Sequence, residues 1–261
     1  MLRDWLPRIL SHSPPSQVAT ADQASREKVN RGWCACCRSD SEFNEAGVWL
    51  RDYYLCTRCH SIPRARAVNV TLDRYFPSWE QLTIHESSPS NDFVSRYCSN
   101  YSSSYFFDGI PLGSEHQGVR CENLEALTFA ASTFDLFITQ DVLEHVFRPD
   151  RAVREIMRVV KPSGAHVFTA PKHKGLRRTI QRARLEADGI AHLLEPQYHG
   201  NPIGDGRALV TWDYGDDFEV RLWEWCEYPT VTYVVRDRQL GIDGEYLEVF
   251  VTRKIGRTTT A

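Results

Sequence analysis

Residues 134–171 read FDLFITQDVLEHVFRPDRAVREIMRVVKPSGAHVFTAP. Two apolar runs, FDLFITQD and AHVFTAP, flank a helical pattern that begins at Pro149 and ends at Pro162 to Gly164. The apolar residues of this helix share one face: Ala152, Val153, Ile156, Met157 and Val160. A strand, a helix and a second strand in this order predict two parallel strands joined by a crossover helix.

The rest of the chain continues this alternation. Strands are expected in LTIHESS (82–88) and SYFFDG (104–109), with a helix in NDFVSRYCSN (91–100) between them. Near the C-terminus, TVTYVVRD and EYLEVFVTRK alternate in polarity and flank the turn-rich RQLGIDG, which predicts an antiparallel closing hairpin. The pattern predicts an α/β fold with a doubly wound sheet.

Composition limits the class of protein. With 261 residues, 42% of them hydrophobic, the chain is long enough for one large domain and a small appendage. The net charge of -3 gives no global reason to expect a nucleic-acid partner, and no apolar run is long enough to span a bilayer. The N-terminal stretch is interrupted by Asp4 and Arg8 and lacks a cleavage site, which argues against a signal peptide. We therefore expect a cytoplasmic protein whose 8 cysteines are thiols or metal ligands.

Four of the cysteines form two C-x-x-C pairs, Cys34 with Cys37 and Cys56 with Cys59. This spacing is typical of a zinc ribbon, and a closed shell of four thiolates makes the ion structural. We predict a ribbon over residues 31–66 that holds Zn²⁺, after a loosely ordered lead-in at 1–30. Free cysteines in a small hairpin are the alternative. Within the metal hypothesis, Cys36 in place of Cys37, His60 in place of a sulfur, and iron in place of zinc stay open.

A helix is expected after the second cysteine pair, in SIPRARAVNVTLDRYFPS. Its apolar residues and interleaved arginines predict an amphipathic helix that docks on the next domain. Arg64 and Arg66 would then lie on a solvated face or, less often, contact an anionic substrate.

Polar residues follow several predicted strands at the points where the strands end: Glu86 to Ser90, Asp108, Asn123, and Asp141 to His145. Ligands of open parallel sheets bind beyond the carboxyl ends of the strands. The fold would therefore gather these residues along one edge of the sheet.

The segment 134–171 also resembles the central region of class I S-adenosylmethionine-dependent methyltransferases, in particular the broad type 11 group. Shared features are the F-D that opens a strand, D-V-L-E-H at its exit, and E-I-x-R-V-V-K-P-S-G at the helix end. The resemblance extends over about residues 67–255, and the ribbon is similar to those of a subset of such proteins. It implies a Rossmann-like, seven-stranded sheet with its last strand antiparallel, in a methyltransferase domain at 67–256 that uses S-adenosylmethionine.

The first strand of this family ends in an acidic residue, which Glu86 matches, and a glycine-rich loop that lets the cofactor's methionine moiety approach the backbone. Here Ser88 and Ser90 stand where glycines are expected, with Pro89 between them. This is a departure, because only glycine takes a positive φ without steric cost. Serine is small enough to remain compatible with cofactor binding.

The resemblance assigns further cofactor contacts. Asp108 would accept hydrogen bonds from the ribose hydroxyls, or else start the turn at Gly109. Asn123, beside Leu124, would accept from the adenine amine, with Glu122 as the adjacent fallback, or else cap a turn.

Gln140 and Asp141 would line the cofactor pocket near the methyl donor. Beside them, His145 would serve as a general base or have a structural role. Methyl transfer to a well-placed nucleophile needs proximity and alignment above all, so no single catalytic residue is obligatory.

An insertion at about 172–212 is the expected lid over the acceptor. Tyr198 and His199 are its candidate acceptor-side residues. Its start is basic and predicts either a solvated helix face or a site for a phosphate or carboxylate group: Lys172, Lys174, Arg177, Arg178, Arg182 and Arg184.

The sequence therefore predicts a methyltransferase that acts on a small-molecule acceptor. One alternative is a noncatalytic binding protein whose Ser88–Ser90 loop has lost cofactor affinity. Another is a methyltransferase of RNA or ribosomal protein that uses the ribbon for recognition. The sequence leaves the acceptor and the oligomeric state open.

Overall fold

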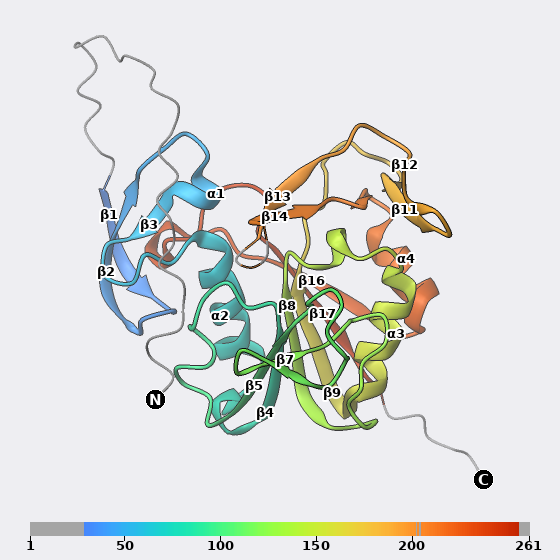
Figure 1. The fold of residues 1–261 in the computed structure, drawn as a ribbon. Coiled ribbons are helices and arrows are strands. Elements are labelled where there is room, and N and C mark those ends of the chain that lie inside the picture. The colour runs from blue at the N-terminus through green and yellow to red at the C-terminus, as the bar shows by residue number, and fades with distance from the viewer. Residues whose placement is uncertain (1–28, 202, 204, 256–261) are drawn as a thin grey trace.

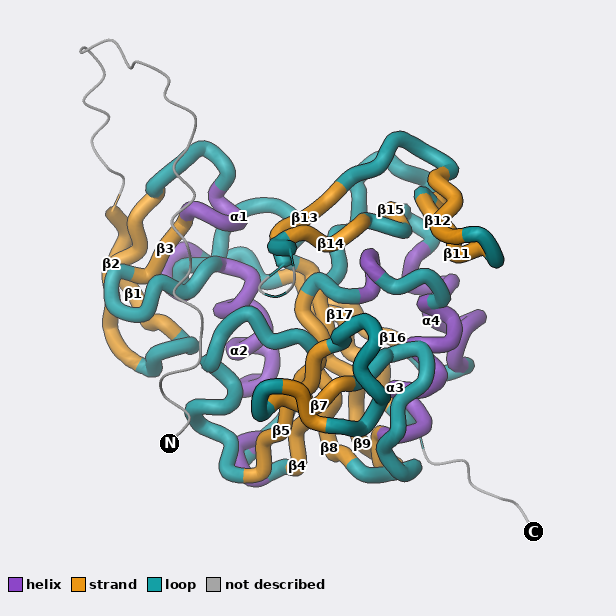
Figure 2. The backbone as a smooth tube through the Cα atoms, viewed as in Figure 1, coloured by secondary structure: helices purple, strands orange, loops and turns teal. Residues whose placement is uncertain are grey.

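The structure is a computed structural model that describes residues 29–201, 203 and 205–255. The chain forms a small N-terminal sheet, a large mixed sheet with helices on both faces, and a group of short hairpins above the large sheet (Figures 1 and 2). Residues 1–28, most of the predicted lead-in, lie outside the described residues. None of the helices in the described ranges is both long and apolar enough to cross a membrane.

The N-terminal sheet consists of β1 (Val29–Cys34), β2 (Ser39–Glu45) and β3 (Tyr54–Cys56), all paired antiparallel. The hairpin expected between the two cysteine pairs is formed by β2 and β3, with the short helix α1 (Leu50–Tyr53) in their connection. Both cysteine pairs lie in or just beyond strand ends, at Cys34 of β1 and Cys56 of β3. The sheet therefore brings the two pairs together.

Helix α2 (Pro63–Tyr75) lies between the small sheet and the large one (Figure 1). Pro63 fits the first helical turn because its missing N–H would have no partner there. Val68 and Leu72 are buried in the same cluster as Ile84 and Leu136 of the large sheet, which confirms that the helix docks on the next domain. Most of its first ten residues are buried, so it is covered on more than one face.

The large sheet has eight strands in the order β16-β17-β9-β8-β4-β5-β7-β6. β4, β5, β7, β8 and β9 run parallel, while β17 is antiparallel to both of its neighbours. This confirms the Rossmann-like sheet with a reversed last strand; the added eighth strand is the short β6, which pairs antiparallel with β7. The bounds are β4 (Thr83–Ser87), β5 (Asn100–Tyr105), β6 (Glu115–His116), β7 (Val119–Cys121), β8 (Phe134–Gln140), β9 (Val160–Thr169), β16 (Thr230–Val234) and β17 (Glu248–Arg253).

Alternate residues of the central strands point to opposite faces of the sheet. In β8, Leu136 and Ile138 pack in the cluster with α2, whereas Phe137 packs in the cluster with α3 (Pro149–Val159) and α4 (Phe218–Cys226). Because both faces are covered, β8 has an almost uninterrupted apolar sequence. Three further elements are short 3₁₀ helices: η1 (Trp79–Gln81), η2 (Leu143–His145) and η3 (Arg238–Leu240).

Two predictions around β5 were wrong. The helix expected at 91–100 is a set of turns in which Arg96 N–H donates to Asp92 O and Cys98 N–H donates to Val94 O. The last predicted helical residue, Asn100, is the first residue of β5. The strand expected at 104–109 ends at Tyr105, and Phe106 is exposed in the loop that follows.

The helix end in the segment 134–171 also differs from the prediction. α3 ends at Val159, and Pro162 to Gly164 already belong to β9. β9 and β8 shift register between Phe134 and Leu136, and a side chain at Gly164 would come within 2.5 Å of Asp135 O. The strand accommodates the Pro-Ser-Gly sequence because glycine permits this close approach.

The insertion folds as short antiparallel hairpins, not as the helix that its basic start suggested. β10 pairs with β15, β11 with β12, and β13 with β14. The bounds are β10 (Ile180–Gln181), β11 (Ala183–Glu186), β12 (Gly189–His192), β13 (Tyr198–Gly200), β14 (Arg207–Leu209) and β15 (Trp212–Asp213).

Candidate functional site

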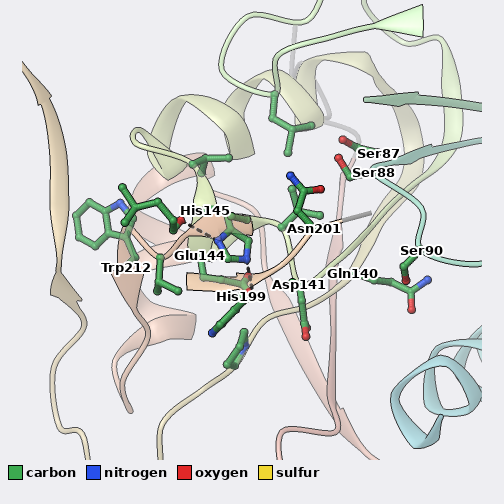
Figure 3. Close-up of a pocket in the computed structure, with 18 of the residues that line it drawn as sticks. Ser87, Ser88, Ser90, Gln140, Asp141, Glu144, His145, His199, Asn201 and Trp212 are labelled. Carbon is green, nitrogen blue, oxygen red and sulfur yellow. Dashed lines mark hydrogen bonds and ion pairs between the residues drawn. The ribbon is translucent and has the colours of Figure 1, made fainter. Parts of the chain in front are cut away.

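A cavity of about 900 Å³ lies at the carboxyl ends of β4 and β8. Its wall combines the parallel sheet, the insertion and an N-terminal module that consists of β1–β3, α1 and α2. Three distant parts of the sequence therefore meet there. β4 contributes Ser87, the loop after it Ser88, and β8 contributes Gln140 (Figure 3). The location is the one where open parallel sheets bind ligands.

The end of β4 lines the cavity with Ser87, and the loop after it with Ser88 and Ser90. Ser88 has a φ of 53° and its N–H donates to Ser104 O at 2.8 Å. The left-handed conformation is the one that glycine would favour at this position. The chain thus keeps a glycine-like turn with a serine in it.

Glu86 is fully buried and does not line the cavity itself. Its carboxylate accepts hydrogen bonds from Gln140 Nε2 at 2.8 Å and from Tyr101 OH at 2.9 Å. Burial raises the pKa of Glu86 to about 7, although these hydrogen bonds act in the opposite direction. Glu86 therefore orients Gln140, which does line the cavity.

Asn123 and Leu124 line the cavity beside β7. Asn123 Oδ1 accepts a hydrogen bond from Glu125 N–H at 2.8 Å, so the residue does cap a turn. A carbonyl oxygen has a second lone pair, and the turn is compatible with a further donor in the cavity. Glu122 Oε2 accepts from Thr128 N–H at 2.9 Å and Oε1 accepts from Arg120 Nε at 2.7 Å, so the carboxylate already has its own partners.

Two expected site residues lie elsewhere. Among the described residues that line the cavity, neither Asp108 nor Tyr198 is included. Asp108 is exposed beyond the end of β5, where Phe106 reaches the cavity instead. Tyr198 is 47% exposed, and Arg207 packs its guanidinium over the ring at 5.0 Å.

Asp141 lies at the exit of β8 with a φ of 51°. Its carboxylate forms ion pairs with Arg51 of α1 and with Arg64 of α2, the latter at 2.6 Å, and accepts from Thr169 Oγ1 at 2.8 Å. Burial acts to raise the pKa of Asp141, but the guanidinium groups of Arg64 and Arg51 outweigh it and hold the pKa far below its usual range. Asp141 is thus a permanent anion that ties the N-terminal module to the sheet.

Arg64 and Arg66 of α2 are therefore not on a solvated face. Arg64 is mostly buried beside Asp141. Arg66 is fully buried and donates to the backbone carbonyls of Tyr54 at 2.6 Å and Gly241 at 2.5 Å. Both bind the protein itself, because α2 is enclosed between the two sheets.

A second cluster of titratable groups consists of Glu144, His145 and His199 (Figure 3). Glu144 Oε1 lies 3.7 Å from His145 Nε2 and 3.8 Å from His199 Nδ1. Burial raises the pKa of Glu144 well above its ordinary range, and the nearby Asp141 carboxylate adds to the rise. Burial lowers the pKa of His145 to about 4, so its ring is neutral at pH 7.

The insertion covers the cavity from above with residues that include His199, Asn201 and Trp212. Its anchor is Thr211, whose N–H and Oγ1 both donate to Glu144 O, at 2.8 and 3.0 Å. Most of its basic side chains are paired with acids: Lys172 with Glu219, Lys174 with Glu245, Arg182 with Asp213, and Arg184 with Glu186. The paired side chains leave less charge for a phosphate or carboxylate group.

The four cysteines of the two pairs come together as predicted, with their sulfur atoms within 4.8 Å of one another. Cys34 and Cys59 are separated by 3.7 Å between sulfurs, and Cys37 and Cys56 by 4.0 Å. Sulfurs bound tetrahedrally at about 2.3 Å from one ion lie about 3.8 Å apart, so the arrangement fits Zn²⁺. Neither His60 nor Cys36 is in this group; Asn69 Nδ2 donates to the sulfur of Cys36 instead.

The sequence did not reveal that Arg51, Arg64 and Trp49 line the cavity, nor that Glu144 is fully buried beside it. Glu144 stands within the quoted D-V-L-E-H motif, so its presence near the site was visible. The contribution of the N-terminal module had no local signal, because Arg51 lies 90 positions before Asp141 in the chain.

The chain was compared with curated proteins and with solved structures. A search of curated proteins finds no match. Among solved structures, the 1,6-didemethyltoxoflavin-N1-methyltransferase of Burkholderia thailandensis is similar at 11% identity, over 74% of this chain and 79% of that one, with a TM-score of 0.46. An S-adenosylmethionine-dependent methyltransferase of Mesorhizobium loti is similar at 14% identity, over 72% and 97%, also with a TM-score of 0.46.

Residues 108–168 match the family described as "Methyltransferase domain", of type 11. The match spans β8, α3 and most of β9. Over residues 108–168 the chain is therefore similar to this methyltransferase family, and the mixed sheet with its reversed last strand is the fold that the resemblance implies.

Proposed function

We propose that the cavity binds S-adenosylmethionine at the ends of β4 and β8 and a small-molecule acceptor beneath the insertion. The observation that carries the proposal is the cavity itself, which joins the family's expected cofactor positions to the inner face of the lid. Its volume of about 900 Å³ lies in the range of small-molecule and cofactor sites.

The residues present fit the cofactor. Ser88 lines the cavity in the left-handed conformation that glycine favours, and Asn123 Oδ1 retains a lone pair for an adenine amine. Gln140 is held by Glu86, and Leu124 offers an apolar contact. Asp108 is exposed outside the cavity, so the ribose contact assigned to it is not part of this proposal.

When bound, S-adenosylmethionine supplies an electrophilic methyl group on sulfur. The residues of this chain position the reacting groups and exclude water, which is the main requirement of a direct displacement. The insertion closes the acceptor side with His199 and Trp212, and the N-terminal module closes another side with Trp49 and Arg51. An enclosed acceptor site favours a small molecule over RNA or a protein.

The test is calorimetric titration of the zinc-loaded protein with S-adenosylmethionine and with S-adenosylhomocysteine. Binding in the micromolar range, about -8 kcal/mol, is expected for the parent. Asn123→Ala should weaken it about tenfold, because the adenine amine loses its acceptor. Asp237→Ala is the matched control, since it removes a similar turn bond, Gln239 N–H to Asp237 Oδ1 at 2.9 Å, away from the cavity.

Absence of heat and of competition with either ligand in the parent would overturn the proposal. It would favour a noncatalytic protein whose serine loop no longer admits the cofactor. Equal weakening by Asn123→Ala and Asp237→Ala would show that the effect arises from lost stability rather than from a lost contact.

A further inference from the structure

We propose that Glu144, His145 and His199 form a binding site for a divalent first-row metal ion, such as Zn²⁺ or Fe²⁺, that is separate from the cysteine cluster. The three side chains offer one carboxylate oxygen and two imidazole nitrogens, all within 4.8 Å of one another. Two histidines and one carboxylate are a donor set that such ions favour in sites with open coordination positions.

The first argument is the state of Glu144. Its side chain is 2% exposed, and within the described part of the chain neither carboxylate oxygen has a hydrogen-bond partner. A buried carboxyl group without partners is costly in free energy. A metal ion bound to Oε1 would supply the missing partner.

The second argument is the orientation of His145. Its Nδ1 lies 2.8 Å from Leu209 O, a carbonyl that can only accept a hydrogen bond, so Nδ1 carries the proton. In the neutral ring this leaves the lone pair on Nε2, the atom that faces Glu144. Metal-binding histidines are commonly fixed in this way by a backbone carbonyl.

The third argument is distance. Ligand atoms held tetrahedrally at about 2.0–2.1 Å from one ion lie about 3.4 Å apart. Glu144 Oε1 is 3.7 Å from one imidazole nitrogen and 3.8 Å from the other, a few tenths of an ångström more than this separation, and the two nitrogens lie within 4.8 Å of each other. His199 is on β13 of the insertion and is 37% exposed at the side chain, which leaves it free to adjust.

The neighbouring arginines are paired with carboxylates other than that of Glu144. Arg51 and Arg64 are both bonded to Asp141, and Arg51 also pairs with Asp52 at 3.4 Å. The open side of the cluster faces the same cavity as Gln140 and Asp141, because all of these residues line it. A metal here would offer its remaining positions to an oxygen atom of the acceptor. That last role rests on the proposed function, whereas metal binding does not.

The experiment measures metal per chain in the full-length protein after loading with Zn²⁺ and, in parallel under anaerobic conditions, with Fe²⁺, followed by removal of weakly bound ions. The parent should hold one ion more than the cysteine cluster accounts for. His199→Ala and Glu144→Gln should each lose that additional ion and keep the ion of the cysteines.

His173→Ala is the matched control. His173 lines the same cavity and its Nε2 also lies 3.7 Å from a carboxylate, Asp213 Oδ1, but it is outside the three-donor cluster. It should retain the additional ion. His199→Ala changes a partly exposed residue and should fold even if Glu144→Gln, at a buried position, does not.

The proposal is overturned if the parent binds no more metal than the cysteine cluster, or if His199→Ala retains the additional ion. Loss of S-adenosylhomocysteine binding with retention of the additional metal would instead reject the proposed function and leave the metal site standing.

Discussion

At the scale of single residues, burial determines the chemistry of this site more than sequence position does. Asp141 and Glu144 are three positions apart, and both are buried. Asp141 has two guanidinium partners and stays ionised, whereas Glu144 has no hydrogen-bond partner among the described residues and its pKa is raised. The environment shifts the pKa values of these two nearby carboxyl groups in opposite directions.

Glu86 leads to a prediction about pH. Because burial raises its pKa from 4.5 to about 7, the folded protein keeps a proton that the unfolded chain releases in this interval. Glu86 therefore lowers the stability progressively as the pH rises from about 4.5 to 7, by up to about 3 kcal/mol. Glu86→Gln has no titrating group at this position. The difference in free energy of unfolding between the variant and the parent should therefore change in favour of the variant by up to this amount as the pH rises from about 4.5 to 7. Urea denaturation of both proteins at several pH values measures it; a constant difference would contradict the prediction.

At the scale of elements, the N-terminal module is part of the cavity wall. α1 contributes Arg51 and α2 contributes Arg64 to the ion pairs with Asp141, and Arg66 joins β3 to the chain at Gly241. The position of α1 in turn depends on β2 and β3, whose ends carry the cysteine cluster. Loss of a metal ion from the cysteine cluster should therefore weaken ligand binding in the cavity.

Cys56→Ser tests this connection. The variant should hold less metal at the ribbon and be less stable, since a structural zinc site contributes directly to folding. It should also bind S-adenosylhomocysteine more weakly, because Arg51 and Trp49 lose their support. Cys36→Ser is the control: this cysteine lies between two ligands in sequence but outside the cluster, and should retain the metal. Full metal retention by Cys56→Ser would refute the ligand assignment.

At the scale of the whole molecule, one cavity is shared by three parts of the chain. A ligand that binds the folded protein alone stabilises it by about 2.7 kcal/mol at a concentration of 100 times its Kd. Because all three parts line the cavity, we expect S-adenosylhomocysteine to slow amide hydrogen exchange in α1, η2 and β13 as well as in β4 and β8. Exchange measured by mass spectrometry with and without ligand checks this. Protection confined to β4 and β8 would show that the lid and the N-terminal module act independently of the cofactor.

The sequence by itself determined the parallel sheet, the closing hairpin, the cysteine cluster and the positions of Gln140, Asp141 and Asn123 at one edge. These features depend on local periodicity and fixed spacing, and the almost uninterrupted apolar sequence of β8 requires cover on both of its faces. The prediction failed at 91–100, where the chain forms turns and β5 begins at Asn100.

Only the tertiary structure decided which residues meet. Arg51 and Asp141 are 90 positions apart in the sequence, and His145 and His199 are separated by α3, β9 and much of the insertion. No local pattern relates the members of either pair. Their contacts arise from packing α2 between two sheets and from anchoring the insertion through Thr211. Burial is likewise a property of the assembled fold; it raises the pKa of Glu144, whose oxygens have no hydrogen-bond partner among the described residues.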